Sequence, residues 1–378
     1  MAGTCGIPPA VANNAPSSFP IGTTSVTFSA PDVGSCVTSV TVNPARGRQL
    51  AVGTTHSGIQ TLDIYKLSSP FAALEQNITV GTGFAYDFSP NGDKVAVATY
   101  SGSTGIVDLS TGASAIDFTG TNTVATSLNS QLIVAWHNSG KVYAVLGRGS
   151  TNRPTIQVVG TSAGASPNLM QTVHPPLPNG FDLTQLQLPT ISFSNDGSRL
   201  VIAGSGAFHS GYRNIALTAR TNPNGMIIPG SWQTAMTEIV DAEYREEIHE
   251  IAFRSSTTEI ATNRNVYTLN AAGTNWVFVR ARNNVGSAFG GSGRILALTE
   301  SAPSTTLRVV LMDIASGTAN NGPTYSYGSQ KGEVALSVDA NRIAVLDRQG
   351  VRVYDKSFNQ ISQILDPSAG KMRFRPGN

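Results

Sequence analysis

Apolar and polar residues alternate along most of the chain in short runs that are separated by polar turns. Residues 87–99, DFSPNGDKVAVAT, show the unit, which is a strand-like run, a turn containing Asn-Gly and a second strand-like run. Residues 192–204, SFSNDGSRLVIAG, are a near copy. Asn and Gly tolerate the positive φ angles of tight hairpins. The pattern therefore predicts hairpins of short strands, and no stretch clearly indicates a core helix.

The unit recurs along the chain. Each copy has two strand-like runs, then a turn and a third strand-like run. Seven copies begin near residues 37, 84, 124, 190, 248, 285 and 334. A blade of four short strands takes roughly 40–50 residues, so most intervals fit one blade. A long insertion is expected at 160–188. Further β-prone segments follow as fourth strands, among them 73–80, 114–118, 155–159 and 275–279.

Such blades bury both faces only when each is stacked between two neighbours. The sequence therefore predicts an all-β fold, a seven-bladed β-propeller of four-stranded antiparallel blades, spanning residues 21–378 as one domain. An extended arm, residues 1–20, precedes it. Two strand-like segments, 25–32 and 372–378, could close the ring, and the sequence leaves both open. Residues 232–250 are either an outer strand with a charged loop or a helical turn.

Several segments resemble the repeats of WD-repeat-like β-propellers of bacterial or viral type. They are FSPNGDKVAVA (88–98), IVDLSTG (106–112), FSNDGSRLVIAG (193–204) and LMDIASG (311–317). The resemblance covers roughly residues 37–365, but the repeats are degenerate. The Gly-His dipeptide is missing, and the Trp-Asp position reads Val107-Asp108, Met312-Asp313 and Tyr354-Asp355. Propellers of this kind are mostly interaction platforms and less often enzymes, so the resemblance implies a binding role.

Composition limits the classes of function that this chain is expected to have. Only 13% of the residues are charged and the net charge is +2, without a Lys/Arg cluster, so nucleic-acid binding is not expected. The start of the chain shows no secretory signal and no apolar run could span a membrane, which predicts cytoplasmic synthesis. Cys5 and Cys36 either form a bridge that holds the arm or remain free thiols.

The histidines suggest a recognition face. His56, His137 and His209 are expected in turns between second and third strands, where Tyr100 is their counterpart. His174 and His249 are expected in links that open on the same side. Such a face could change charge near pH 6, although turns also carry arbitrary polar neighbours. The predicted binding residues are His56, Tyr100, His137, His174, His209, Tyr212, Glu246, Glu247 and His249.

Two apparent motifs indicate no chemistry, and an acidic segment has two interpretations. A calcium loop starting at Asp87 needs a carboxylate eleven positions later, where the chain has Ala98. GTSAG, residues 160–164, fits a nucleophile elbow only in an α/β sheet. The acidic segment 241–250 is a solvated loop or, on the histidine face, an electrostatic contact. No catalytic residue, metal or cofactor is expected.

The sequence favours a non-enzymatic interaction or structural protein that presents loops on one face to a protein or glycan. Low charge and an ordered arm would suit a component of a virion or a similar assembly, with the arm also contacting partners. The alternative is a propeller enzyme of the lactonase or glycan-cleaving type. Its site would lie where the central channel opens on the histidine face.

Overall fold

The computed structural model describes residues 12–13, 22–30, 34–42, 48–56, 58–81, 83–118, 123–161, 166–209, 211–240, 251–253, 258–262, 265–270, 276–281, 286–290, 295–301, 306–313, 319–326, 333–347 and 349–376. Their regular structure is β-strand apart from short 3-10 turns such as η2 (Leu109–Thr111), so the predicted all-β class is confirmed. The chain divides into two compact units, Met1–Arg46 and Gly47–Asn378, rather than at the expected boundary near residue 20.

The smaller unit is a three-stranded sheet of β1 (Ala12–Asn13), β2 (Gly22–Ala30) and β3 (Gly34–Val42). β2 and β3 pair without a bulge, from the pair Gly22–Val42 to the pair Ala30–Gly34. The start of the first blade near residue 37 was therefore predicted wrongly, because those residues pair with β2. Of the predicted arm, only β1 is described. Cys36 is exposed on β3, and a bridge to Cys5, which lies outside the described residues, stays a prediction.

The larger unit contains one five-stranded sheet and six four-stranded sheets among its described residues. The first sheet is, from edge to edge, β10 (Ala115–Asp117), β6 (Ala73–Gly81), β5 (Ile59–Lys66), β4 (Gln49–His56) and β32 (Met372–Phe374), and the second is β11 (Thr123–Ala125), β9 (Ser103–Asp108), β8 (Lys94–Thr99) and β7 (Phe84–Phe88). The third sheet is β12 (Ser130–Trp136), β13 (Val142–Arg148), β14 (Pro154–Gly160) and β15 (Asn168–Val173), and the fourth is β16 (Gln187–Phe193), β17 (Arg199–Phe208), β18 (Gly211–Arg220) and β19 (Gln233–Val240). The fifth sheet is β20 (Ile251–Phe253), β21 (Glu259–Thr262), β22 (Asn265–Leu269) and β23 (Trp276–Ala281), the sixth is β24 (Gly286–Gly290), β25 (Ile295–Ser301), β26 (Thr306–Asp313) and β27 (Ala319–Ser326), and the seventh is β28 (Val334–Leu336), β29 (Arg342–Asp347), β30 (Gly350–Asp355) and β31 (Gln360–Ile364).

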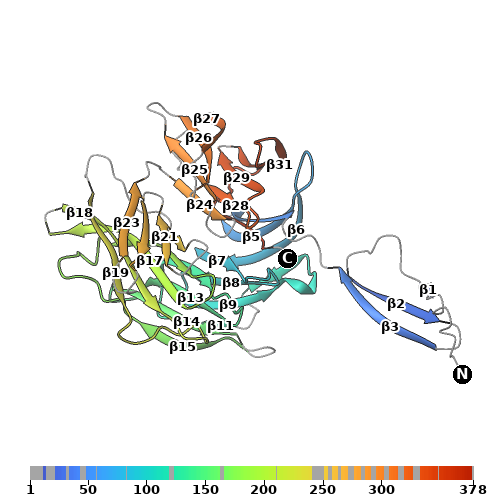
Figure 1. Ribbon diagram of the computed structural model, residues 1–378, viewed down its shortest axis with the longest axis horizontal. Coiled ribbons are helices and arrows are strands. Elements are labelled where there is room, and N and C mark those ends of the chain that lie inside the picture. The colour runs from blue at the N-terminus through green and yellow to red at the C-terminus, as the bar shows by residue number, and fades with distance from the viewer. Residues whose placement is uncertain are drawn as a thin grey trace, which may run out of the picture. The chain divides into compact units, whose positions relative to one another are not determined.

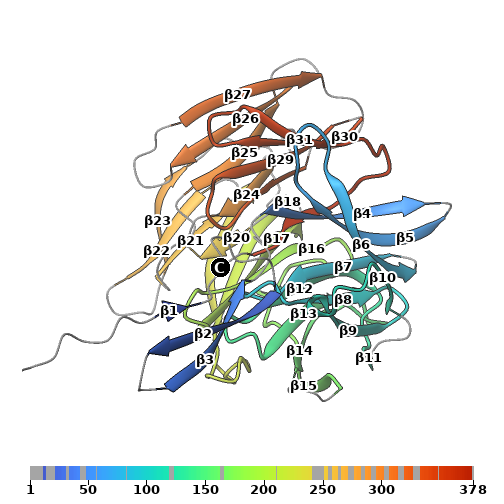
Figure 2. The same cartoon turned by 90° about the vertical axis from the view of Figure 1, so that its right-hand side faces the viewer.

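These sheets are arranged as a propeller. All described pairings in them are antiparallel except that of β10 with β6. Figure 2 shows the sheets of the larger unit following one another, with β24 to β27 stepping outward from the middle. The innermost strands adjoin, β7 beside β12, β12 beside β16 and β16 beside β20. The predicted propeller arrangement is thus confirmed, and five of the seven expected blades are established.

Hydrophobic side chains fill the space between neighbouring sheets. Leu62 and Ile78 of one sheet pack with Tyr86 and Val97 of the next, and all four are almost completely buried. Val95 and Val97 of β8 face one neighbour, while Ala96 and Ala98 face the other. Both faces of a strand are therefore apolar, which is the reason for its near-continuous hydrophobic sequence.

The predicted starts near residues 84, 190, 248, 285 and 334 lie close to the innermost strands β7, β16, β20, β24 and β28. The start near 124 does not, because those residues form β11, the outermost strand of the preceding sheet. The innermost strand of the third sheet is instead β12. Residues 232–250 begin as an outer strand, β19, rather than a helical turn.

Two of the segments expected to be fourth strands are not the fourth strands of their own sheets. Residues 114–118 include β10, which crosses to the edge of β6 in the neighbouring sheet, and 155–159 lie in the third strand β14. Residues 73–80 and 275–279 do lie in the fourth strands β6 and β23. The insertion expected at 160–188 contains the fourth strand β15, so only the link after it is additional.

The C-terminal segment completes the first sheet. β32 pairs with β4, placing Met372 beside Val52 and Phe374 beside Leu50. Lys371 accepts a hydrogen bond of 2.8 Å from the Tyr86 hydroxyl through its carbonyl oxygen. Arg375 is buried, and its Nε donates to the carbonyl oxygen of Gly92 at 2.5 Å. Of the two segments that could close the ring, the C-terminal one therefore does so.

The turn between the first and second strands has one design in four sheets. In each, a residue's N–H donates to the carbonyl of the residue five positions later, and the third residue beyond it has positive φ. The first residues of these turns are Ser89, His137, Ser194 and Ser337. The serine hydroxyls bond to a polar side chain two positions later, which is Asn91, Asp196 or Asp339. The opening sequence motif is therefore a hairpin turn.

We expect a protein carrying both Asp196→Asn and Asp339→Asn to fold, because Asn91 occupies the equivalent place in the β7–β8 turn. Burial opposes ionisation of both aspartates, but hydrogen bonds outweigh it and lower the pKa of each. Their ionised form stabilises the native state above the unfolded pKa, near 4, and this stability is lost as the pH falls through the lowered folded pKa.

The double variant should therefore be less stable than the wild type at pH 7, and the difference should shrink toward pH 2. Urea denaturation at a series of pH values measures this. A difference that stays constant with pH would show that the two carboxylates do not stabilise the turns through their charge.

Candidate interaction site

The loops of the larger unit lie on two sides of the blades. Turns between second and third strands contact the links that lead into the first strands of the same sheets. Tyr100 N–H donates to the Gly83 carbonyl oxygen at 2.9 Å, and His209 N–H donates to that of Gly180 at 3.0 Å. We call this side, made of the turns between second and third strands and the adjoining links, the loop face. The turns between first and second strands lie at the opposite ends of the strands.

Four of the predicted binding residues lie on the loop face. Tyr100, His174 and His209 are exposed, and Tyr212 is half-buried. His174 Nδ1 lies 3.0 Å from the hydroxyl of Thr155. Only two of the four, His209 and Tyr212, belong to one hairpin. His56 ends β4, but its side chain is outside the described residues, as are Glu246, Glu247 and His249.

The prediction for His137 is wrong. It follows the innermost strand β12, so it lies at the opposite ends of the strands, and only 2% of it is exposed. Its Nδ1 lies 2.8 Å from the Ser139 hydroxyl and its Nε2 lies 3.0 Å from the Gly197 carbonyl oxygen. Its ring packs edge-on against Phe193. His137 thus joins two neighbouring sheets and has no free ring nitrogen for a ligand.

The hairpin of β17 and β18 extends farther than its neighbours on the loop face. Each strand has ten residues, and Figure 1 shows β18 reaching outward at the left. The link after β15 holds the end of this hairpin. Phe181 forms a bridge with Phe208, and Asp182 N–H donates to the Ala207 carbonyl oxygen at 2.9 Å. The end of the hairpin is therefore braced from outside.

Aromatic rings and a guanidinium gather at this braced end. Phe208 meets Phe181 with ring centroids 5.0 Å apart, and it meets His209 at 4.5 Å, both edge to face. The Arg213 guanidinium carbon lies 4.2 Å from the centre of the Phe208 ring, which is a cation–π contact. We call Phe181, Phe208, His209 and Arg213 the aromatic tip. His209 is exposed and the other three are half-buried.

Sequence reasoning found part of the aromatic tip. It selected His209 and the adjacent Tyr212, but missed Phe181, Phe208 and Arg213. Phe208 and Arg213 flank the selected turn directly, in the run AFHSGYR, so the concentration of aromatic and basic residues there was a usable signal. Phe181 carried none, because its contact with Phe208 depends on how the link folds back.

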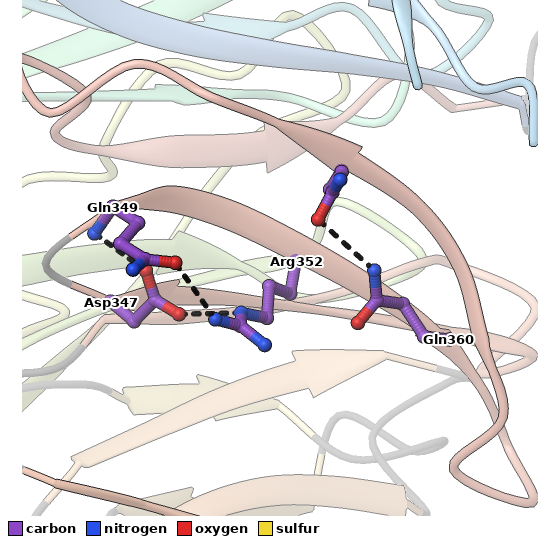
Figure 3. Close-up of polar contacts among 5 residues, drawn as sticks. Asp347, Gln349, Arg352 and Gln360 are labelled. Carbon is purple, nitrogen blue, oxygen red and sulfur yellow. Dashed lines mark hydrogen bonds and ion pairs between the residues drawn. The ribbon is translucent and has the colours of Figure 1, made fainter. Parts of the chain in front are cut away.

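Many of the described aspartates hold turns. Asp182 accepts from both the N–H and the hydroxyl of Thr184, and Asp355 accepts from the side chain and N–H of Asn359. These hydrogen bonds lower the pKa of both carboxyls. Figure 3 shows a third case, in which Asp347 accepts from Arg352 Nε at 2.6 Å and from the Gln349 N–H. Carboxylates held in this way are structural acceptors.

Asp87 differs from the turn aspartates because it lies on the innermost strand β7. Burial raises the pKa of its carboxyl, and the positive charge of Arg373 opposes this effect. Its Oδ2 accepts from the Trp136 N–H at 3.2 Å. The surroundings of Asp87 therefore favour the protonated form of its carboxyl.

Within the described ranges, no group of three His, Cys, Asp or Glu residues could hold a metal ion. No described helix is long and apolar enough to cross a membrane.

Comparisons with known proteins identify the architecture. No family model and no curated protein matches the sequence. The periplasmic gluconolactonase PpgL of Pseudomonas aeruginosa has a similar structure, at 13% identity and a TM-score of 0.59 over 86% of this chain and 98% of that one. The chain is a β-propeller.

The propeller also resembles the β-propeller domain of Cps50 (Swd1) from Myceliophteria thermophila, at 11% identity and a TM-score of 0.54 over 82% of this chain and 94% of that one. A functionally unknown protein from Desulfotomaculum acetoxidans matches at 12% identity and a TM-score of 0.54, over 87% and 99%. At such identities the likeness shows the fold alone, so function must be argued from the site.

Proposed function

We propose that this protein is a non-enzymatic, seven-bladed β-propeller that binds a partner protein through its loop face. Its main contact is the aromatic tip. The blade count is supported by the one five-stranded and six four-stranded sheets, each of which contains most of one predicted repeat. The shared hairpin turn of Ser89, Ser194 and Ser337 supports the WD-repeat-like character.

The aromatic tip is the observation that carries this proposal. Interface residues that dominate binding energy are enriched in aromatic side chains and arginine. Here the rings and the guanidinium are already packed together, so binding would cost little side-chain entropy. A hydrolytic site needs acids and bases within hydrogen-bond reach of one substrate atom. The described turn aspartates are engaged elsewhere, and His137 is used in packing.

The alternative is an enzyme of the lactonase or glycan-cleaving type with its site at the channel mouth. Asp87 favours this alternative, because its carboxyl lies on an innermost strand and its pKa is raised. The propeller fold shared with a gluconolactonase makes a lactone the first substrate to test. The expected roles in a virion or another assembly, and in binding glycans, stay predictions.

Glucono-δ-lactone should therefore be hydrolysed no faster with the purified protein than without it, as measured by proton release in weak buffer. Asp87→Asn should give the same rate as the wild type. Turnover by the wild type that Asp87→Asn abolishes would establish the enzymatic alternative instead.

Asp87→Asn should also change the dependence of stability on pH. A raised folded pKa means that the native state holds this proton more tightly than the unfolded state. The wild type therefore loses stability as the pH rises from the unfolded pKa, near 4, through the raised folded pKa. The variant lacks this loss, so its thermal midpoint should exceed that of the wild type at pH 7 and not at pH 3. A wild-type advantage at both pH values would contradict the burial argument.

Partner binding is tested by quantitative capture from cells of the source organism. Wild type and Phe71→Ala should retain the same partner, whereas Phe208→Ala should retain far less of it. Phe71 is the matched control, since it is an exposed phenylalanine in the turn between β5 and β6, away from the loop face. Equal capture by all three proteins would exclude the aromatic tip as the contact.

A further inference from the structure

We propose that the aromatic tip recognises an acidic peptide segment of the partner, in which a carboxylate stands next to an apolar side chain. Arg213 and His209 would hold the carboxylate, and the edges of Phe181 and Phe208 would contact the apolar neighbour. This proposal rests on the proposed function and names the chemistry of its ligand.

Arg213 is the first argument. Its guanidinium stacks on Phe208, and among the described residues its side chain has no hydrogen bond or ion pair. Stacking occupies one face of the guanidinium and leaves the N–H groups along its edge available. A planar guanidinium offers these donors in a fork that matches a carboxylate with two parallel hydrogen bonds. Because the stack already fixes the plane of the fork, less freedom is lost on binding.

His209 is the second argument. It follows Phe208 directly, has a positive φ of 51° and is exposed. Its backbone N–H is held by Gly180, so the position of the residue is set by the link as well as by the hairpin. No hydrogen bond of its ring nitrogens to another described residue is present. A ring N–H can therefore donate to the same anion as Arg213.

The surrounding charge and shape also favour a peptide carboxylate. Asp182, the acidic residue of the bracing link, has both oxygens engaged by Thr184 and Gln185, so it is committed to its own turn. A sugar ring stacks on an open aromatic face, but Arg213 covers a face of Phe208 and its neighbours meet it edge to face. The tip therefore offers an anion site with apolar edges rather than a stacking platform.

The test is fluorescence anisotropy at low ionic strength with three labelled synthetic peptides. One carries repeated Glu-Phe pairs, the second Gln-Phe pairs and the third Glu-Ala pairs. The wild type should bind the Glu-Phe peptide at least tenfold more tightly than either of the others. Arg213→Ala should lose at least tenfold in affinity for it. Arg213→Lys should also lose affinity, because lysine keeps the charge but not the planar fork.

Arg220→Ala is the matched control, because Arg220 is exposed at the opposite end of the same strand β18. It should bind the Glu-Phe peptide as the wild type does, and unchanged circular dichroism should show that all variants fold. Equal affinity for the Glu-Phe and Gln-Phe peptides, or an unaffected Arg213→Ala, would overturn the proposal. Tighter binding of an oligoglucuronate than of the Glu-Phe peptide would overturn it in favour of a glycan.

The two proposals fail separately. If partner capture depends on Phe208 but none of the acidic peptides binds, the acidic ligand is wrong while the interaction site stands. If capture does not depend on Phe208, the proposed interaction site itself is wrong.

Discussion

Replacing Phe374 with alanine is expected to lower the free energy of unfolding by about 3–5 kcal/mol. Phe374 is the last residue of β32 and only 6% of it is exposed. It packs in the cluster that contains Leu50 and Val52 of β4 together with Val351 and Val353 of β30. Its removal would leave a cavity where the first and last sheets of the larger unit meet. Urea denaturation followed by circular dichroism measures the effect.

Leu365→Ala is the matched control for this experiment. Leu365 belongs to the same C-terminal segment, but 63% of it is exposed, so the change should stay within about 0.5 kcal/mol. If Phe374→Ala costs no more than Leu365→Ala, the β32–β4 pairing does not close the propeller in solution.

Gly197→Ala should destabilise the protein by roughly 2–5 kcal/mol, and Gly230→Ala by only about 1–2 kcal/mol. The two glycines have nearly the same backbone angle, with φ of 71° and 70°. Both substitutions therefore carry the same cost of placing a side chain in the left-handed region. A methyl group at Gly230 meets nothing within 4 Å, whereas one at Gly197 would overlap the His137 ring and the Asn138 amide. The difference isolates the contact between sheets.

The wild type, both alanine variants and the Gly197→Ala/His137→Ser double variant should be compared by the same denaturation experiment. Serine stands at the equivalent place in the other turns of this design, so His137→Ser should recover part of the loss. Equal costs at Gly197 and Gly230 would mean that the close approach of His137 does not exist in solution.

The repeat pattern was enough to predict the propeller, because both faces of a blade strand are apolar and its turns carry Asn-Gly or Asp-Gly. It was not enough to predict every pairing. Residues 37–42, VTSVTV, are strand-like, yet they pair with β2. Contacts between distant parts of the chain decide which segment pairs with the edge of β4. Local alternation of apolar and polar residues does not encode these contacts.

The third repeat shows a different limit. His137 takes the place of the serine that marks the first turn elsewhere, so HNSG could not be told apart from a turn between second and third strands. That single substitution moved the predicted repeat by one strand and His137 to the wrong face. At the aromatic tip, His209 was found from its turn, whereas Phe181 comes from a link whose path only the fold reveals.

Pairing of β32 with β4 also sets an order of events during synthesis. Arg375 and Gln49, which hydrogen-bond across this closure, are 326 residues apart in sequence. At translation rates of about 5–20 residues per second, β4 waits roughly 15–65 s for its partner. During that interval the inner edge of β4 is an unpaired strand edge, which can join with other chains. Newly made molecules should therefore remain vulnerable to aggregation through this edge until β32 emerges from the ribosome.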